Sequence, residues 1–160
     1  MKVNTTRFGV IDVDESSTIT MAKGPLGFED QTLYVLIQHR PDTKFRWLQS
    51  LEEPCLAFVV VDPTDFFADY SFEVPDAEAE KLRLASEDDA LALLVVSIAG
   101  EGTDVTADLA APIVINSKEL IGMQVVLQDT QYSVKHPLVE QGRKQPAKAA
   151  RKTRVTAKAA

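Results

Sequence analysis

The sequence has few of the residues that disulfide frameworks and metal centres require. Its 160 residues include one cysteine, Cys55, and two histidines. A single cysteine excludes an internal disulfide and fits a reducing compartment such as the cytoplasm. Neither histidine stands near a cysteine or an acid at the spacing of a zinc site, which needs three or four ligands. We therefore expect neither a metal nor another cofactor.

Long apolar stretches are also missing. No run approaches the roughly 20 residues that a membrane-spanning helix needs, and the first ten residues contain no apolar core of a signal peptide. We therefore expect a cytoplasmic protein without membrane contact. Hydrophobic residues still make up 45% of the chain, which is enough for one globular domain with a sizeable core.

Motifs of catalysis are absent as well. The chain contains no GxSxG sequence of a nucleophile elbow, and its glycine-containing stretch at Lys23–Gly27 lacks the spacing of a phosphate-binding loop. Acidic pairs such as Glu52 and Glu53 are adjacent, and neighbours on a strand point to opposite faces. We therefore expect no catalytic residues and no enzymatic activity.

The charge is divided sharply along the chain. Residues 1–141 hold 10 basic and 24 acidic side chains, a balance of −14, whereas residues 142–160 hold 7 basic side chains and no acid. An acidic body repels nucleic acid and attracts basic proteins. The tail has too few large apolar residues to offset the entropy of ordering it. We predict a folded domain over residues 1–139 and a disordered basic tail over 140–160.

Short β-branched or alternating segments predominate between turn residues, which predicts a mainly β fold. We expect a small antiparallel β-barrel-like domain with one or two short helices. The helix is predicted at Ala77–Leu84, with Asp76 as its cap. The predicted strands are Phe8–Val13, Ser17–Met21, Thr32–Gln38, Phe45–Leu48, Leu56–Val61, Tyr70–Val74, Leu91–Ala99, Val105–Leu109, Ile113–Asn116, Leu120–Leu127 and Thr130–Val134.

One of these strands is bounded by acids and prolines at both ends. Ser50 and Glu53 have the spacing of a helical capping box, which favours a single turn that Pro54 limits. The strand Leu56–Val61 follows, and its unbroken apolar sequence predicts burial on both faces. Asp62-Pro63 ends it. The acids at these two corners could be presented to a partner by the rigid sheet.

Two segments have the composition of a protein interface. The first, Asp62–Phe72, combines four aromatic residues with three acids, although its aromatic residues could equally form core. The second is the loop Gly24–Glu29, which could also be a simple turn. The predicted partner-binding residues are Phe28, Glu29, Glu52, Glu53, Asp62, Asp65, Phe66, Phe67, Asp69 and Tyr70.

Several blocks of the sequence resemble one family in the same order, across about Val3–Leu138. The block Phe45–Phe58 (FRWLQSLEEPCLAF), the loop Gly24–Glu29, the segment Phe66–Tyr70 and the stretch Leu109–Asn116 (LAAPIVIN) are similar to motifs of the flagellar assembly factor FliW family. Asp108 stands where that family usually has asparagine. The basic tail is not part of the family's pattern.

The resemblance implies a small β-barrel-like protein that binds and does not catalyse. FliW proteins bind the translational repressor CsrA and also flagellin. When flagellin is scarce, FliW is free to bind CsrA, so CsrA leaves the flagellin mRNA and synthesis resumes. When flagellin accumulates, it occupies FliW and repression returns. We expect a monomer that does not bind nucleic acid directly through its acidic body.

Other functions remain open at this point. A small β-barrel ligand-binding protein or hydrolase with a carboxylate-lined cavity is the main alternative, and a closed apolar pocket would favour it. An RNA-binding module led by the tail is a third, although that tail lacks interleaved aromatic residues. The tail itself could be inert, contact nucleic acid, or fold back on the acidic body and mask it from a basic partner.

Overall fold

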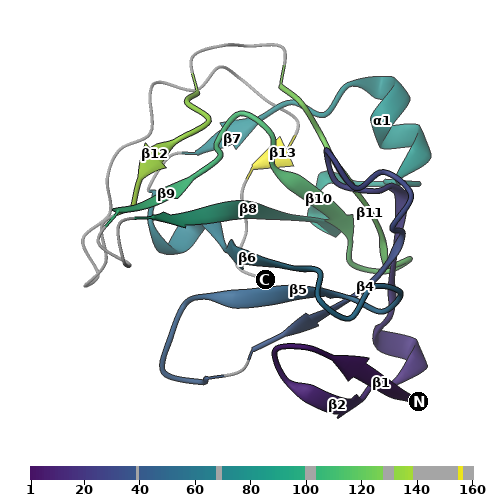
Figure 1. Ribbon diagram of the computed structural model, residues 1–160. Coiled ribbons are helices and arrows are strands. Elements are labelled where there is room, and N and C mark those ends of the chain that lie inside the picture. Colours follow the sequence, from purple (N-terminus) through teal and green to yellow (C-terminus); the bar gives the residue numbers. More distant parts are fainter. Residues whose placement is uncertain (39, 68–69, 100–103, 128–131, 139–154, 157–160) are drawn as a thin grey trace.

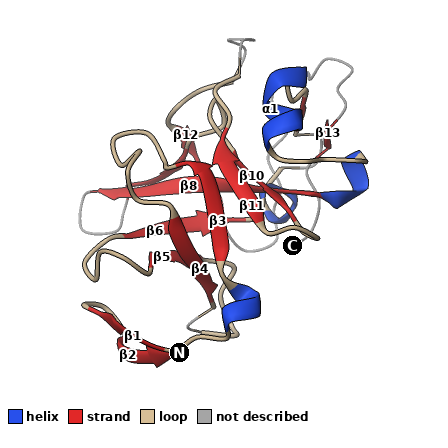
Figure 2. Ribbon diagram, turned by 90° about the vertical axis from the view of Figure 1, so that its right-hand side faces the viewer, coloured by secondary structure: helices blue, strands red, loops and turns tan. Residues whose placement is uncertain are grey.

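Strands dominate the structure. The computed structural model describes residues 1–38, 40–67, 70–99, 104–127, 132–138 and 155–156 (Figure 1). Its helices are short: α1 at Asp76–Lys81 and the single 3₁₀ turns η1 at Glu15–Ser17, η2 at Pro63–Asp65 and η3 at Glu87–Asp89 (Figure 2). Within these residues, no helix has the length and apolar character to cross a membrane.

The strands begin and end close to the predicted turns. They are β1 (Lys2–Thr5), β2 (Gly9–Asp12), β3 (Ile19–Lys23), β4 (Leu33–Ile37), β5 (Arg46–Ser50), β6 (Ala57–Val61), β7 (Ser71–Phe72), β8 (Ala90–Ala99), β9 (Asp104–Ala107), β10 (Ile113–Asn116), β11 (Ile121–Gln124), β12 (His136–Pro137) and β13 (Val155–Thr156).

Seven of the described strands close into a barrel. Their order is β10-β11-β3-β4-β5-β6-β8, and β8 closes the ring by pairing with β10. At ten residues, β8 is long enough to pair with three strands: β6 on one edge, and β9 and β10 in succession on the other. The mainly β, barrel-like fold predicted from the sequence is therefore confirmed.

One pairing in the barrel departs from the antiparallel prediction. β11 and β3 run parallel, and their register shifts at Gly122 and Met123. The two strands lie far apart in the sequence, so no tight hairpin turn fixes their relative direction. Gly122 has no side chain to place against its neighbours: a Cβ there would lie 2.9 Å from the Met21 sulfur and 3.2 Å from Ile115.

Side chains of the barrel strands divide between an interior and an exterior core. Along β8, Leu93 packs inside the barrel with Ile113 and Tyr34, whereas its neighbour Leu94 packs outside. This alternation follows from the two-residue repeat of a strand. In β6, Val60 faces the interior cluster and Val61 the exterior one, and both are fully buried. The predicted burial on both faces therefore holds at the end of the strand, whereas Ala57, Phe58 and Val59 are partly exposed.

The remaining described elements cover the outside of the barrel. The segment after β6 and the helix α1 contribute Phe66, Phe72 and Leu82 to the exterior core. The hairpin β1–β2 packs its own small cluster against Val35 of β4. Arg7 at the tip of this hairpin lies over the ring of Trp47, with its guanidinium carbon 4.2 Å from the ring centroid.

Some local predictions were wrong in detail. The helix is shorter than expected, and Asp76 is its first residue, with Pro75 at the capping position. Residues 132–134 of the predicted strand Thr130–Val134 form no strand, and pairing occurs instead at β12. The spacing of Ser50 and Glu53 produces hydrogen bonds to the Ser50 hydroxyl but no helical turn. The strand β1 was not predicted.

Most of the predicted basic tail lies outside the described residues. The exception is β13, which pairs with β7 in an antiparallel ladder. Nothing in the sequence of residues 155–156 predicted this pairing.

Candidate functional site

The predicted partner-binding residues separate into two groups, at opposite ends of β6. Glu52 and Glu53 precede this strand, and Asp62 and Asp65 follow it. The side chain of Glu52 accepts hydrogen bonds from the backbone amides of Thr32, at 2.7 Å, and Leu33, at 3.1 Å. Glu52 thus fastens the corner to the start of β4, so part of its hydrogen-bonding capacity is already used within the fold.

The second acid of this corner contacts the single cysteine. Cys55 donates from its thiol to the Glu53 carboxylate at 3.2 Å. This hydrogen bond and the negative charge of Glu53 raise the pKa of the Cys55 thiol, so the thiolate is disfavoured. Cys55 is exposed. The turn between Pro54 and β6 lifts it out of the sheet.

The acids after β6 have structural partners. Asp62 is buried, and its carboxylate accepts hydrogen bonds from the Thr64 amide at 2.9 Å and the Thr64 hydroxyl at 2.7 Å. It therefore caps η2, which begins at Pro63. Asp65 is partly exposed at the end of that turn. Of the two, only Asp65 offers its side chain to the surface.

The aromatic residues of the first predicted interface lie in the core. Phe66, Phe67 and Tyr70 are each only 2% exposed. The Tyr70 hydroxyl donates to the carbonyl of Leu109 at 2.7 Å, and burial raises the pKa of Tyr70 well above its usual value. Their large apolar area is thus used to cover the barrel, the alternative that the sequence left open. Asp69 lies outside the described residues.

The second predicted interface, the loop Gly24–Glu29, is exposed and closely built. The Gly24 amide donates to the Glu29 carbonyl at 3.2 Å. A Cβ on Gly24 would collide with the carbonyl oxygens of Phe28 and Gln31, so only glycine fits there. Gly27 adopts a φ of +89°. This geometry directs Leu26 and Phe28 toward solvent, where they are 53% and 42% exposed.

Acidic side chains from two segments lie near this loop. Hydrogen bonds from its own backbone amide and from the Gly27 amide lower the pKa of Glu29, which keeps it ionised. Glu52 also lies here, because its carboxylate accepts a hydrogen bond from the amide of Thr32, and Thr32 is three residues after Glu29 in the sequence. Burial, followed by the charges of Glu52 and Asp30, raises the pKa of Tyr34 to about 12. Glu29, Asp30 and Glu52 therefore form an acidic surface next to the loop.

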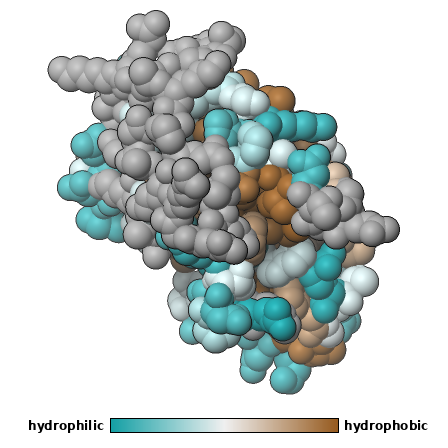
Figure 3. Space-filling model, turned by 90° about the vertical axis from the view of Figure 1, so that its left-hand side faces the viewer, coloured by the Kyte–Doolittle hydropathy of each residue, from teal (hydrophilic) through white to brown (hydrophobic). Residues whose placement is uncertain are grey.

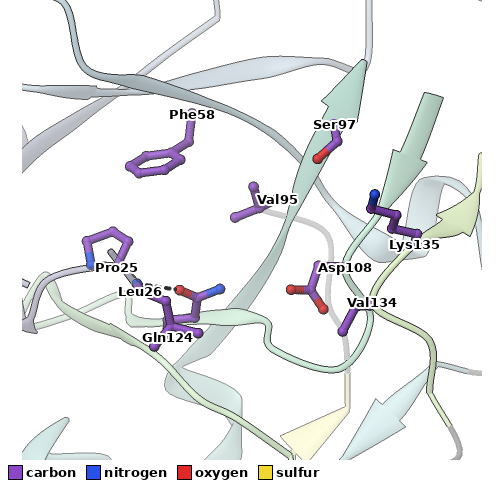
Figure 4. A pocket seen from close by; sticks show the side chains of 9 residues that line it. All are labelled: Pro25, Leu26, Phe58, Val95, Ser97, Asp108, Gln124, Val134 and Lys135. Carbon is purple, nitrogen blue, oxygen red and sulfur yellow. Dashed lines mark hydrogen bonds between the residues drawn. The ribbon is translucent and has the colours of Figure 1, made fainter. Parts of the chain in front are cut away.

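A cavity of about 310 Å³ lies between the loop and β8 (Figure 4). Phe58 of β6 and Val95 of β8 form its apolar wall, and the loop contributes Pro25 and Leu26. The Gln124 side chain accepts a hydrogen bond from the Leu26 amide at 2.9 Å, which ties the loop to β11. The Phe28 ring packs edge-on against Phe58, with centroids 5.6 Å apart.

A second cavity, of about 530 Å³, adjoins the first along β8. The two share Phe58, Val95 and Ser97, and the second extends to Trp47 and the exposed side chain of Ile98. It opens where β6 and β8 separate, because their described pairing ends at Val59 and Val96. We call the two cavities together the apolar hollow. Figure 3 shows hydrophobic side chains gathered in a hollow on the corresponding side of the molecule.

Polar groups in the hollow are few. Among the described residues that line the first cavity, Asp108 carries a carboxylate and Lys135 carries a positive charge. Burial raises the pKa of Asp108, while hydrogen bonds from the amides of Ala110 and Ala111 oppose that shift. In the described part of the chain, no group of three or more potential metal ligands is present. The hollow is open and mostly apolar, unlike the carboxylate-lined cavity of the alternative function.

Sequence reasoning found the loop but missed the hollow. Phe58 belongs to a strand whose burial was predicted and Val95 to a predicted strand, and nothing in their local sequence shows that β6 and β8 diverge. Leu26 could have indicated an apolar surface here, because a large apolar residue in a glycine-rich loop has no strand or helix face to bury it.

Comparisons with known proteins agree with this architecture. The family model described as FliW protein matches residues 2–138. The chain belongs to the FliW family. A flagellar assembly factor FliW from Geobacter sulfurreducens is 40% identical over 147 residues, which cover 92% of each chain. One from Syntrophotalea carbinolica is 41% identical over 134 residues, which cover 83% of this chain and 94% of the relative.

A solved FliW structure has the same fold. The crystal structure of a flagellar assembly factor FliW superposes with a TM-score of 0.81 at 34% identity, covering 88% of this chain and 99% of that one. The FliW family match ends at Leu138, so the basic residues of 142–160 are an addition to the matched FliW region. The barrel, the Gly24–Glu29 loop and the apolar hollow lie within that region.

Proposed function

We propose that this protein is a cytoplasmic regulatory binding protein of flagellum assembly, that it binds CsrA and flagellin, and that it has no enzymatic activity. Membership of the FliW family supports a role in flagellar assembly. The observation that carries the choice of CsrA is the balance of −14 over residues 1–141. CsrA binds RNA and needs a positive surface, so an acidic body attracts it and opposes RNA phosphates nearby.

The two partners would use different chemistry. We assign the acidic surface of Glu29, Asp30 and Glu52 to the basic repressor, since exposed opposite charges steer association. We assign the apolar hollow to flagellin, since an open apolar groove suits the apolar face of an amphipathic helix. The exposed Leu26 and Phe28 stand between these areas. Flagellin bound at the hollow would lie beside the repressor's surface.

This arrangement explains how the protein would regulate synthesis. With little flagellin, the free protein binds CsrA, and CsrA leaves the flagellin mRNA. With abundant flagellin, the hollow is occupied and CsrA returns to the mRNA. The protein would act as a monomer, and it would contact neither membranes nor, through its acidic body, nucleic acid.

Titration calorimetry with purified CsrA and purified flagellin tests the proposal. We expect saturable binding of each partner at 50 mM NaCl (about 14 Å Debye length, by scaling), and release of a flagellin leader RNA from CsrA on addition of the protein. Added flagellin should reverse that release. Failure of both partners to bind at low ionic strength would overturn the proposal.

A further inference from the structure

The edge of β7 is occupied by the chain's own C-terminal segment. β7 is not part of the barrel, and its partner among the described strands is β13, with Val155 opposite Phe72 and Thr156 opposite Ser71 (Figure 1). An extended segment that adds to a free strand edge is a recurrent mode of peptide recognition. The segment that occupies this edge comes from the basic tail, which the FliW family match does not include.

The backbone of β7 presents its two sides to different neighbours. The Tyr132 hydroxyl donates to the Ser71 carbonyl at 2.8 Å and accepts from the Ser71 amide at 3.4 Å. Backbone groups of successive strand residues point to opposite sides. The amide and carbonyl of Phe72 therefore face β13, and Phe72 and Val155 form the hydrogen-bonded pair of the ladder. Tyr132 therefore holds β7 in the orientation in which the amide and carbonyl of Phe72 face β13.

Acidic side chains lie beside the pairing of β7 with β13. β13 also contacts η3, whose three residues are Glu87, Asp88 and Asp89. Glu87 and Asp88 are exposed. The tail contains seven basic residues and no acid over residues 142–160. The segment that pairs with β7 belongs to this basic tail, and the exposed acids of η3 would attract basic residues that flank it in the sequence, most strongly at low salt.

We propose that the edge of β7, with η3 beside it, is a docking site for an extended basic peptide, and that residues 155–156 of the tail occupy this site in cis. The backbone of Phe72 supplies the directional contacts, and η3 selects basic sequences. Because the tail is tethered, its effective concentration at the site is on the order of millimolar. A partner's basic segment would have to displace it, which weakens apparent binding. This docking site is independent of whether the protein binds CsrA or flagellin.

Two proline variants of the full chain test the pairing. Val155→Pro removes the amide that faces Phe72, whereas Thr156→Pro removes one that faces away from β7. Measured by NMR, exchange of the Phe72 amide should accelerate by about tenfold or more in Val155→Pro, since the edge then opens to solvent. It should stay near the wild-type rate in Thr156→Pro. Equal exchange rates in wild type and Val155→Pro would overturn occupation in cis.

A synthetic peptide of residues 142–160 tests the site itself. It should bind the full-length Val155→Pro chain about fivefold or more tighter than the wild-type chain, whose own tail competes. Chemical-shift changes should fall on Phe72 and η3. No binding to the Val155→Pro chain would overturn the docking site, whatever the outcome with CsrA and flagellin.

The role of the acids has its own matched control. Within the Val155→Pro chain, Glu87→Gln with Asp88→Asn should weaken the peptide about threefold to tenfold at low salt and flatten its salt dependence, because two attractive charges are lost. Glu78→Gln with Glu80→Gln on α1 removes the same charge elsewhere and should change binding less. Equal effects of the two pairs would overturn selection by η3.

Discussion

Single acidic residues in this protein serve different purposes even when they are adjacent. Glu52 holds the amides of Thr32 and Leu33, whereas the Glu53 carboxylate accepts a hydrogen bond from the exposed Cys55 thiol. The same contrast holds after β6, where Asp62 is a buried cap and Asp65 is partly exposed. Sequence composition therefore overstates how much acidic surface is free for a partner.

This difference predicts unequal costs of mutation at the corner. Glu52→Ala should lower the free energy of unfolding by about 1 kcal/mol, since two backbone amides lose a charged acceptor that water replaces only in part. Glu53→Ala, one residue away, should change it by less than about 0.5 kcal/mol. Urea denaturation of both variants at pH 7 measures the difference. Equal values would contradict the structural role of Glu52.

Asp108 predicts a dependence of stability on pH. Burial raises its pKa in the folded state above the usual 3.8, so folding loses stability as the pH rises from 3.8 through that raised value. Asp108→Asn keeps an acceptor for the Ala110 and Ala111 amides and carries no charge. We expect it to be more stable than wild type at pH 7, with the difference shrinking as the pH falls toward 3.8. A difference that grows on acidification would contradict this.

At the scale of elements, one buried side chain joins the helix to the barrel. Asn116, at the end of β10, donates to the carbonyls of Leu82 and Arg83 at 2.9 and 3.0 Å, just beyond α1. Its oxygen accepts from the amides of Lys118 and Glu119. The N-terminal end of the helix has no side-chain capping hydrogen bond, and Asn116 holds the chain beyond its C-terminal end.

Asn116→Ala should therefore cost about 2 kcal/mol or more, because several buried backbone groups lose their partner. The exposed neighbour Ser117→Ala provides the control and should cost less than about 0.5 kcal/mol. Chemical denaturation gives the values, and hydrogen exchange at Leu82 and Arg83 should accelerate in the first variant alone. A neutral Asn116→Ala would show that packing of Leu82 suffices.

In the Gly24–Glu29 loop, we expect a mutation to weaken flagellin binding without lowering the stability of the fold. Leu26→Asp should leave the melting temperature unchanged, since the side chain is more than half exposed. It should weaken flagellin binding by about tenfold, or 1.4 kcal/mol, since it places a charge at the edge of the apolar hollow. Val10→Asp, on β2, changes an equally exposed apolar residue and should have no effect. Equal loss in both variants would remove the hollow as the flagellin site.

Elements were predictable where local sequence and tertiary contacts agree. β10 begins and ends at the predicted residues, and β6 differs by one residue. Prediction failed where distant contacts decide: the parallel pairing of β11 with β3, the pairing of β13 with β7, and the small β12. The aromatic segment after β6 was ambiguous, because its composition suits an interface and a core equally.

For the whole molecule, charge was readable from sequence and surface shape was not. The division into an acidic body and a basic tail follows from counting residues. The apolar hollow arises because β6 and β8 diverge and because a loop anchored by Gln124 borders the opening. Four of the predicted partner-binding residues, Phe28, Glu29, Glu52 and Glu53, lie on the loop or on the corner before β6.

The salt dependence of CsrA binding tests the central claim most directly. Affinity should fall steeply from 50 to 500 mM NaCl, because screening weakens attraction between an acidic body and a basic partner. Asp30→Lys, on the surface assigned to CsrA, should weaken binding and reduce that slope more than Glu15→Lys, which makes the same change in charge at an exposed position elsewhere. Affinity that is unchanged across this range of salt, or absence of binding at its low end, would contradict the account.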